Sequence, residues 1–202
     1  MRPRLRPPHR PASTGARVQR RERGAVAVEA AIVSTLLFTI LAGVVDVSML
    51  FRTTYEVSSA SRAGARLAAQ QPLAPTFARD AAVQVVASLE GMDYTRVTRI
   101  WVYRANPNSP TGEPASGSTC STQCVKFTVT SAGVVSAGTG AWTGRMACAG
   151  EPVSGVDPVD AVGVRVQYQH NAPIRFADEQ LVQETTTMRL EQLSSSLVCV
   201  SS

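Results

Sequence analysis

The chain has 202 residues, a formal net charge of +5 and an apolar content of 44%. Residues 1–24 contain eight arginines and one glutamate, so the other 178 residues sum to a charge of about −2. This balance excludes the broad basic surface of a nucleic-acid-binding domain, and the length allows one folded domain beside a membrane segment.

The first predicted element is a basic, proline-containing leader over residues 1–24. It precedes an apolar stretch from Ala25 to Phe51, in which the sixteen residues from Ala30 to Val45 carry no charge. As a helix, this stretch is long enough to cross a bilayer. Because four arginines cluster between residues 17 and 23, the positive-inside rule predicts a cytoplasmic amino terminus and an extracytoplasmic carboxyl-terminal domain.

Three interpretations of the apolar stretch compete. A secretory signal peptide has an apolar region of only about 7–15 residues before a small-residue cleavage site, which the sequence at Val44–Val47 does not provide. A retained single-pass anchor in the cell membrane fits better. The sharper hypothesis adds a cut after Gly24.

Two carboxylates, Glu29 and Asp46, frame the uncharged run. Ionisable groups are costly inside a membrane and therefore call for a functional reason. We interpret both as candidate charge-pairing residues. The alternative for Glu29 is a carboxylate at the membrane edge, and the alternative for Asp46 is a marker of the outer interface.

The helical pattern continues beyond the membrane to about Gln71, because no proline interrupts residues 12–71. Ala60, Gly64 and Ala68 form a stripe of small residues at four-residue intervals, which lets another helix approach closely. The alternative is that alanine simply favours a helix. We therefore expect one transmembrane and protruding helix over residues 25–71.

The same residues resemble the TadE-like family of pseudopilins, which belong to the Flp (Tad) pilus and secretion apparatus. The resemblance covers residues 23–69 and rests on Arg-Gly, a following glutamate, the apolar run, an acidic residue and an Ala-Arg-x-Gly-Ala-Arg-like helix end. In this chain these are Arg23, Gly24, Glu29, Asp46 and the motif residues Arg62, Gly64, Ala65 and Arg66.

The resemblance implies a prepilin-peptidase cut between Gly24 and Ala25 on the cytoplasmic face. Glu29 would then be the fifth residue of the mature chain, where its carboxylate can pair with the new terminal ammonium on the same helix face or on a neighbouring helix. The partners implied are the membrane, other pilins or pseudopilins and the peptidase. The fold implied is pilin-like.

Residues 72–202 form the predicted exported domain. Apolar periodicity predicts an amphipathic helix over 78–89 that ends near Gly91. Alternating patterns predict four strands, over 96–104, 125–130, 162–168 and 181–193, with Gly- and Ser-rich loops over 106–121 and 131–157. In the first strand, Val97 is expected on the same face as Trp101 and Tyr103. The predicted fold class is α+β, with the helix covering one face of a four-stranded antiparallel sheet.

Four cysteines follow the apolar stretch and none precedes it: Cys120, Cys124, Cys148 and Cys199. An even number on one side of a membrane favours disulfides in an oxidising compartment, with three possible pairings. Free thiols and a zinc site are the alternatives. Zinc is disfavoured because Cys120 and Cys124 lack a second closely spaced ligand pair.

Nothing in the sequence predicts an enzyme, a cofactor, a metal site or a small-molecule substrate. His170 is the only histidine of the exported domain, and we expect it to face solvent. The acidic residues there show no paired spacing for acid–base chemistry. The predicted function is therefore structural, as a minor pilin or pseudopilin. The alternative is a singly anchored exported binding protein that is neither processed nor polymerised.

Overall fold

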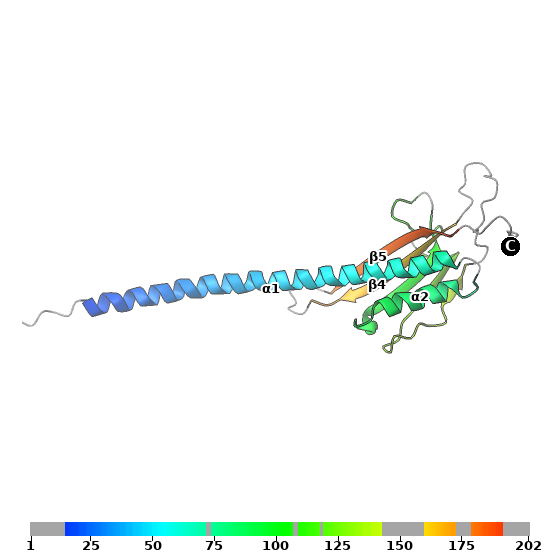
Figure 1. The fold of residues 1–202 in the computed structure, drawn as a ribbon. Coiled ribbons are helices and arrows are strands. Elements are labelled where there is room, and N and C mark those ends of the chain that lie inside the picture. The colour runs from blue at the N-terminus through cyan, green and yellow to red at the C-terminus, as the bar shows by residue number, and fades with distance from the viewer. Residues whose placement is uncertain are drawn as a thin grey trace, which may run out of the picture. The chain divides into compact units, whose positions relative to one another are not determined.

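The computed structural model describes residues 15–71, 74–106, 109–117, 119–142, 160–172 and 179–191, with side chains from residue 24 onward. The chain divides into two compact units, residues 1–45 and residues 46–202. The first described element, α1 (Gly15–Gln70), contributes to both units (Figure 1). It begins ten residues before the predicted start at Ala25, because the chain after Pro11 contains good helix formers and no further proline.

The second unit is an α+β domain built on a five-stranded antiparallel sheet. The strands are β1 (Val97–Arg104), β2 (Cys124–Phe127), β3 (Thr139–Ala141), β4 (Ala161–His170) and β5 (Gln180–Arg189), in the spatial order β3-β2-β1-β4-β5. Helix α2 (Phe77–Ser88) matches the predicted helix within one residue at each end. A short 3₁₀ helix, η1 (Tyr94–Arg96), leads into β1.

The predicted number of four strands is wrong, because β3 pairs with β2 as a fifth strand. It lies in the segment that we interpreted as a loop. Its three residues, Thr139, Gly140 and Ala141, have no alternating pattern and include a glycine at φ 95°. A side chain at Gly140 would collide with the carbonyl oxygen of Cys124, so the close pairing of the two strands depends on this glycine.

The predicted face of Val97 is also wrong. The register between β1 and β4 shifts between Val97 and Arg99, which is a β-bulge. A bulge adds one residue to one strand and thereby reverses the alternation of its side chains. Val97 consequently joins Ile100 and Val102 in the main core, whereas Trp101 and Tyr103 lie in a second cluster on the opposite face.

The main core lies between one sheet face and the two helices (Figure 1). The sheet contributes the fully buried valines of β4 and the inward residues of β1, and the carboxyl-terminal part of α1 contributes small side chains. Burial of each such side chain is worth roughly 1–3 kcal/mol before the entropy of ordering it is subtracted. The buried residues of α1 beyond Val57 are mostly alanines: Ala60, Ala65, Ala68 and Ala69.

Candidate functional site

Residues 24–41 of α1, in the first unit, present a largely apolar surface. From Gly24 to Leu41 every residue is exposed, and the exposed fraction reaches 70% at Phe38. Within the described residues, one helix, Gly24–Gln70, is long and apolar enough to cross a membrane. Length and composition alone support this statement.

Two threonine hydroxyls of this apolar surface are satisfied within the helix itself. The hydroxyl of Thr35 donates to the carbonyl oxygen of Ala31 at 2.8 Å, and that of Thr39 donates to the carbonyl oxygen of Thr35 at 2.9 Å. Such back-bonding hides a hydroxyl from an apolar solvent. Glu29 differs, because its carboxylate is exposed among apolar neighbours.

The predicted cleavage residues, Gly24 and Ala25, are exposed and lie inside α1. Gly24 has open space around the position where a side chain would begin, as far as the described residues extend. A glycine inside a helix destabilises it by about 0.5–1 kcal/mol relative to alanine. The helix is therefore easier to unwind locally at Gly24 than at the alanines that follow.

The part of α1 in the second unit is held against the sheet by polar contacts as well as apolar ones. The hydroxyls of Ser61 and Thr186 lie 2.7 Å apart, which joins α1 to β5. The backbone nitrogen of Glu191 donates to the carbonyl oxygen of Ala69 at 2.9 Å and fixes the end of the helix to the segment after β5. Asp46, the second predicted carboxylate, is only 7% exposed and belongs to this unit.

His170 corrects our expectation, because it is buried rather than exposed to solvent, with 7% of its surface accessible. It is the last residue of β4, and its Nδ1 lies 3.0 Å from the hydroxyl of Thr53 on α1. The same hydroxyl lies 3.0 Å from the carbonyl oxygen of Met49, to which it can donate. No local pattern indicates this pair, because the two residues are 117 positions apart.

The helix motif predicted from the family resemblance divides between a buried and an exposed face. Gly64 and Ala65 are buried, whereas Arg62 and Arg66 are exposed. A Cβ atom on Gly64 would lie 2.5 Å from Val85 Cγ2 and 3.0 Å from the carbonyl oxygen of Ala81, both on α2. The helix that approaches the small-residue stripe is therefore α2 of the same chain.

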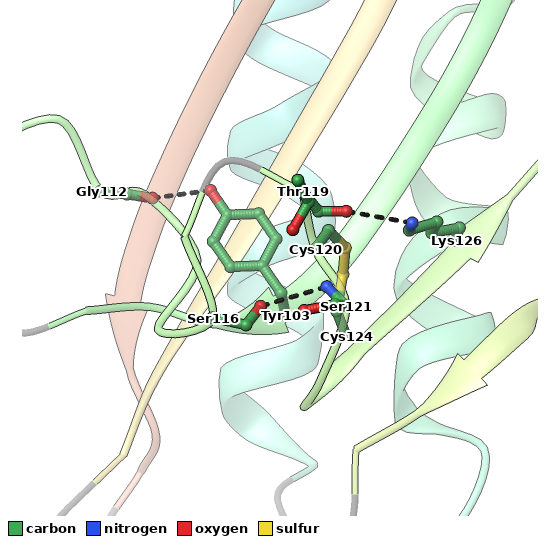
Figure 2. The surroundings of a disulfide bond; sticks show 8 residues. All are labelled: Tyr103, Gly112, Ser116, Thr119, Cys120, Ser121, Cys124 and Lys126. Atoms are coloured by element: carbon green, nitrogen blue, oxygen red, sulfur yellow. Dashed lines mark hydrogen bonds between the residues drawn. A yellow bond between two sulfur atoms is a disulfide. The ribbon is translucent and has the colours of Figure 1, made fainter.

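The loop between β1 and β2 carries the disulfide that Figure 2 shows. The sulfurs of Cys120 and Cys124 are bonded, with their Cα atoms 5.5 Å apart. Beside them the hydroxyl of Tyr103 donates to the carbonyl oxygen of Gly112 at 2.6 Å. Burial raises the pKa of Tyr103. The other two predicted cysteines, Cys148 and Cys199, lie outside the described residues.

The described residues contain no group of three or more His, Cys, Asp or Glu side chains that could hold a metal ion. Cys120 and Cys124 are bonded to each other. The site geometry therefore consists of one helix with two surfaces, an exposed apolar one and one packed on its own sheet.

Comparison with known families identifies the segment that carries both surfaces. Residues 24–66 match the family model described as TadE-like protein. The segment is TadE-like. This confirms the resemblance inferred from the sequence, and the match begins at Gly24 and ends at Arg66. No curated protein and no solved structure matches the chain.

Proposed function

We propose that this protein is a membrane-anchored minor pilin or pseudopilin of Tad pilus assembly or secretion, with a structural rather than a catalytic role. The observation that carries the proposal is the TadE-like match over residues 24–66, which coincides with the only candidate membrane-spanning helix in the described residues. The match supports the pilus context. The exposed apolar surface of residues 24–41 supports packing against lipid or other apolar helices.

The first step that we propose is removal of residues 1–24 by a prepilin peptidase. A protease binds its substrate in an extended form, so the helix must unwind at the cut, and Gly24 lowers the cost of unwinding. Cleavage creates an ammonium group on Ala25. The carboxylate of Glu29 is four residues further on and thus on the same helix face, where a charge pair compensates both groups in an apolar environment.

We propose that the amino terminus is cytoplasmic and the second unit extracytoplasmic. The arginines before the apolar stretch support this orientation. The bonded pair Cys120 and Cys124 lies in the second unit and fits an oxidising compartment. In this arrangement, residues 25–45 pack against other pilins in the membrane while the sheet domain presents its surface outside.

A second candidate function is a singly anchored exported binding protein that neither loses its leader nor polymerises. One observation favours it: the small-residue stripe around Gly64 is occupied by α2 of the same chain and is not free for another subunit. In this case Asp46 and Glu29 have no assembly role, and the apolar helix serves as an anchor alone.

The decisive experiment is the amino-terminal sequence and intact mass of the protein extracted from membranes of cells that contain the peptidase. The pilin proposal expects a mature chain that starts at Ala25. Substitution Gly24→Leu should leave the chain uncut, whereas the matched control Gly43→Leu, also in open surroundings, should be cut normally. An intact Met1 in the unsubstituted protein would refute processing and support the second candidate.

Assembly is tested separately with Glu29→Gln, which removes the charge but keeps the shape of the side chain. The variant should be cut after Gly24 yet recovered in cross-linked complexes with other pilins at least tenfold less often. Glu90→Gln, an exposed carboxylate of the second unit, is the matched control. Normal cross-linking of Glu29→Gln would remove the pairing role of Glu29.

A further inference from the structure

The face of the sheet opposite the two helices, called the outer face below, carries a continuous cross-strand row. The register aligns Trp101 of β1 with Lys126 of β2 on one side and with Arg165 of β4 on the other. The row extends to Thr139 of β3 and Thr185 of β5. Directly opposed side chains on neighbouring strands lie within contact distance of one another. The centre of the outer face is therefore an indole between two cations.

Among the described residues, the cations of this row have no acidic partner within ion-pair distance. The Lys126 ammonium lies 5.6 Å from the centre of the Trp101 ring, and the Arg165 guanidinium lies 5.4 Å from it. Arg165 is 8% exposed, and its Nε donates to the Thr185 hydroxyl. Within the described part of the chain, neither of these residues nor Arg99 forms an ion pair. The aromatic ring compensates the charges only partly, so the outer face keeps a positive potential.

A hollow of about 500 Å³ opens beside this row. Its lining includes the cations Arg99 and Lys126, the Trp101 ring and three hydroxyl side chains, Thr128, Ser136 and Thr139. No carboxylate is among the residues that line it. The volume falls within the range of about 300–1,000 Å³ that is typical of small-ligand sites.

The lining groups have hydrogens to donate. The Lys126 ammonium uses one hydrogen on the carbonyl oxygen of Thr119, at 3.1 Å, and keeps two. The Ser136 hydroxyl accepts from the backbone nitrogen of Thr128, at 3.0 Å, and keeps its own hydrogen. A ligand with a carboxylate satisfies the cations, and a ligand with hydroxyl groups satisfies the hydroxyl side chains, which both donate and accept.

We propose that this hollow binds a carboxylate-bearing sugar residue of an acidic saccharide. The carboxylate contacts Lys126 and Arg99, and the ring hydroxyls contact the threonines and the serine. Trp101, which is only 6% exposed, lies in the wall of the hollow and reports binding there. This site lies in the second unit and does not depend on cleavage after Gly24 or on assembly. It gives the exported domain a ligand class of its own.

The test uses the full-length protein in detergent and the fluorescence of Trp101. The chain has two tryptophans, and Trp142→Phe leaves Trp101 as the only one. Tri-galacturonate is the probe, and its fully methyl-esterified form is the uncharged control of the same shape. Tri-glutamate with both peptide ends blocked is the control with the same number of carboxylates, three. The proposal expects saturable binding of tri-galacturonate and at least tenfold weaker binding of both controls.

Two substitutions locate the site. Lys126→Gln and Arg99→Gln should each weaken the binding of tri-galacturonate at least fivefold, with unchanged thermal unfolding. Arg79→Gln is the matched control, because it removes one exposed positive charge from α2 on the other side of the sheet. Equal loss with Arg79→Gln, equal binding of tri-glutamate, or no saturation by tri-galacturonate would each overturn the proposal.

Discussion

The two parts of α1 use similar side chains for different purposes. Residues 24–41 are exposed throughout, although most are apolar. The apolar side chains of residues 57–69 are mostly small, yet the inward alanines among them are almost completely buried by the sheet and α2. The contrast shows that apolar content alone does not determine whether the rest of the chain covers a given face of a helix.

Polar contacts mark the difference between the two parts. In the first unit, threonine hydroxyls bond back to the helix that carries them, as Thr35 does. In the second unit, the hydroxyls of Thr53 and Ser61 also bond back to α1, but in addition they reach β4 and β5. A hydroxyl that bonds only within its own helix leaves the surrounding surface free for any apolar neighbour. A hydroxyl that bonds to a distant strand fixes one specific arrangement.

Among substitutions that test this contrast, a side chain at Gly64 should have the largest effect. Gly64→Val should lower the free energy of unfolding of the second unit by about 1–3 kcal/mol, because the new atoms overlap Val85 and the backbone of Ala81. Urea unfolding followed by near-ultraviolet circular dichroism measures it. Gly43→Val, in the open surroundings of the other part, should leave this transition unchanged. Equal shifts in the two variants would mean that the two surfaces are not distinct.

A somewhat smaller effect is expected from the buried polar pair. Thr53→Val should lower the unfolding free energy of the second unit by about 1–2 kcal/mol, because it leaves the imidazole of His170 without the hydroxyl in a buried place. The control Thr35→Val removes an exposed hydroxyl that bonds only within α1 and should shift the same urea midpoint negligibly. If Thr53→Val were as stable as the parent, the contact would not contribute to holding the helix on the sheet.

The smallest effect concerns pH. Burial raises the pKa of Tyr103 and of Tyr168, so the folded second unit favours the protonated phenols. Their contribution to stability is complete below about pH 10, the ordinary tyrosine value, and is lost as the pH rises through the raised values. Tyr103→Phe should flatten this alkaline loss while it costs about 1 kcal/mol at neutral pH, where the bond to Gly112 is missing. Urea midpoints at pH 8 and pH 11 check both statements, and an unchanged alkaline slope would contradict the role of Tyr103.

Much of the architecture could be predicted because it depends on local patterns. The TadE-like segment, the helix near residues 78–89 and the alternating valines of β4 all appear in the sequence at helical or strand spacing. The strand β3 could not be predicted. Its three residues carry no pattern, and they form a strand only because β2 supplies the hydrogen-bond partners.

The face of Val97 and the burial of His170 were also predicted wrongly, because both depend on contacts with residues far away in the sequence. A bulge places Val97 on the other face of β1. The alternating pattern of residues 97–103 does not indicate this bulge. His170 looked exposed because it ends a strand beside polar residues, but α1 covers it with Thr53. The role of Asp46 in assembly, by contrast, stays a prediction.

The contact between Ser61 and Thr186 joins residues separated by 125 positions. At roughly 5–20 residues per second, synthesis needs roughly 6–25 s to deliver β5 after the helix motif has emerged. For most of that interval the inward face of α1 has neither β4 nor β5 to cover it. The contacts that hold α1 on the sheet are therefore among the most non-local of the second unit, and such contacts slow folding.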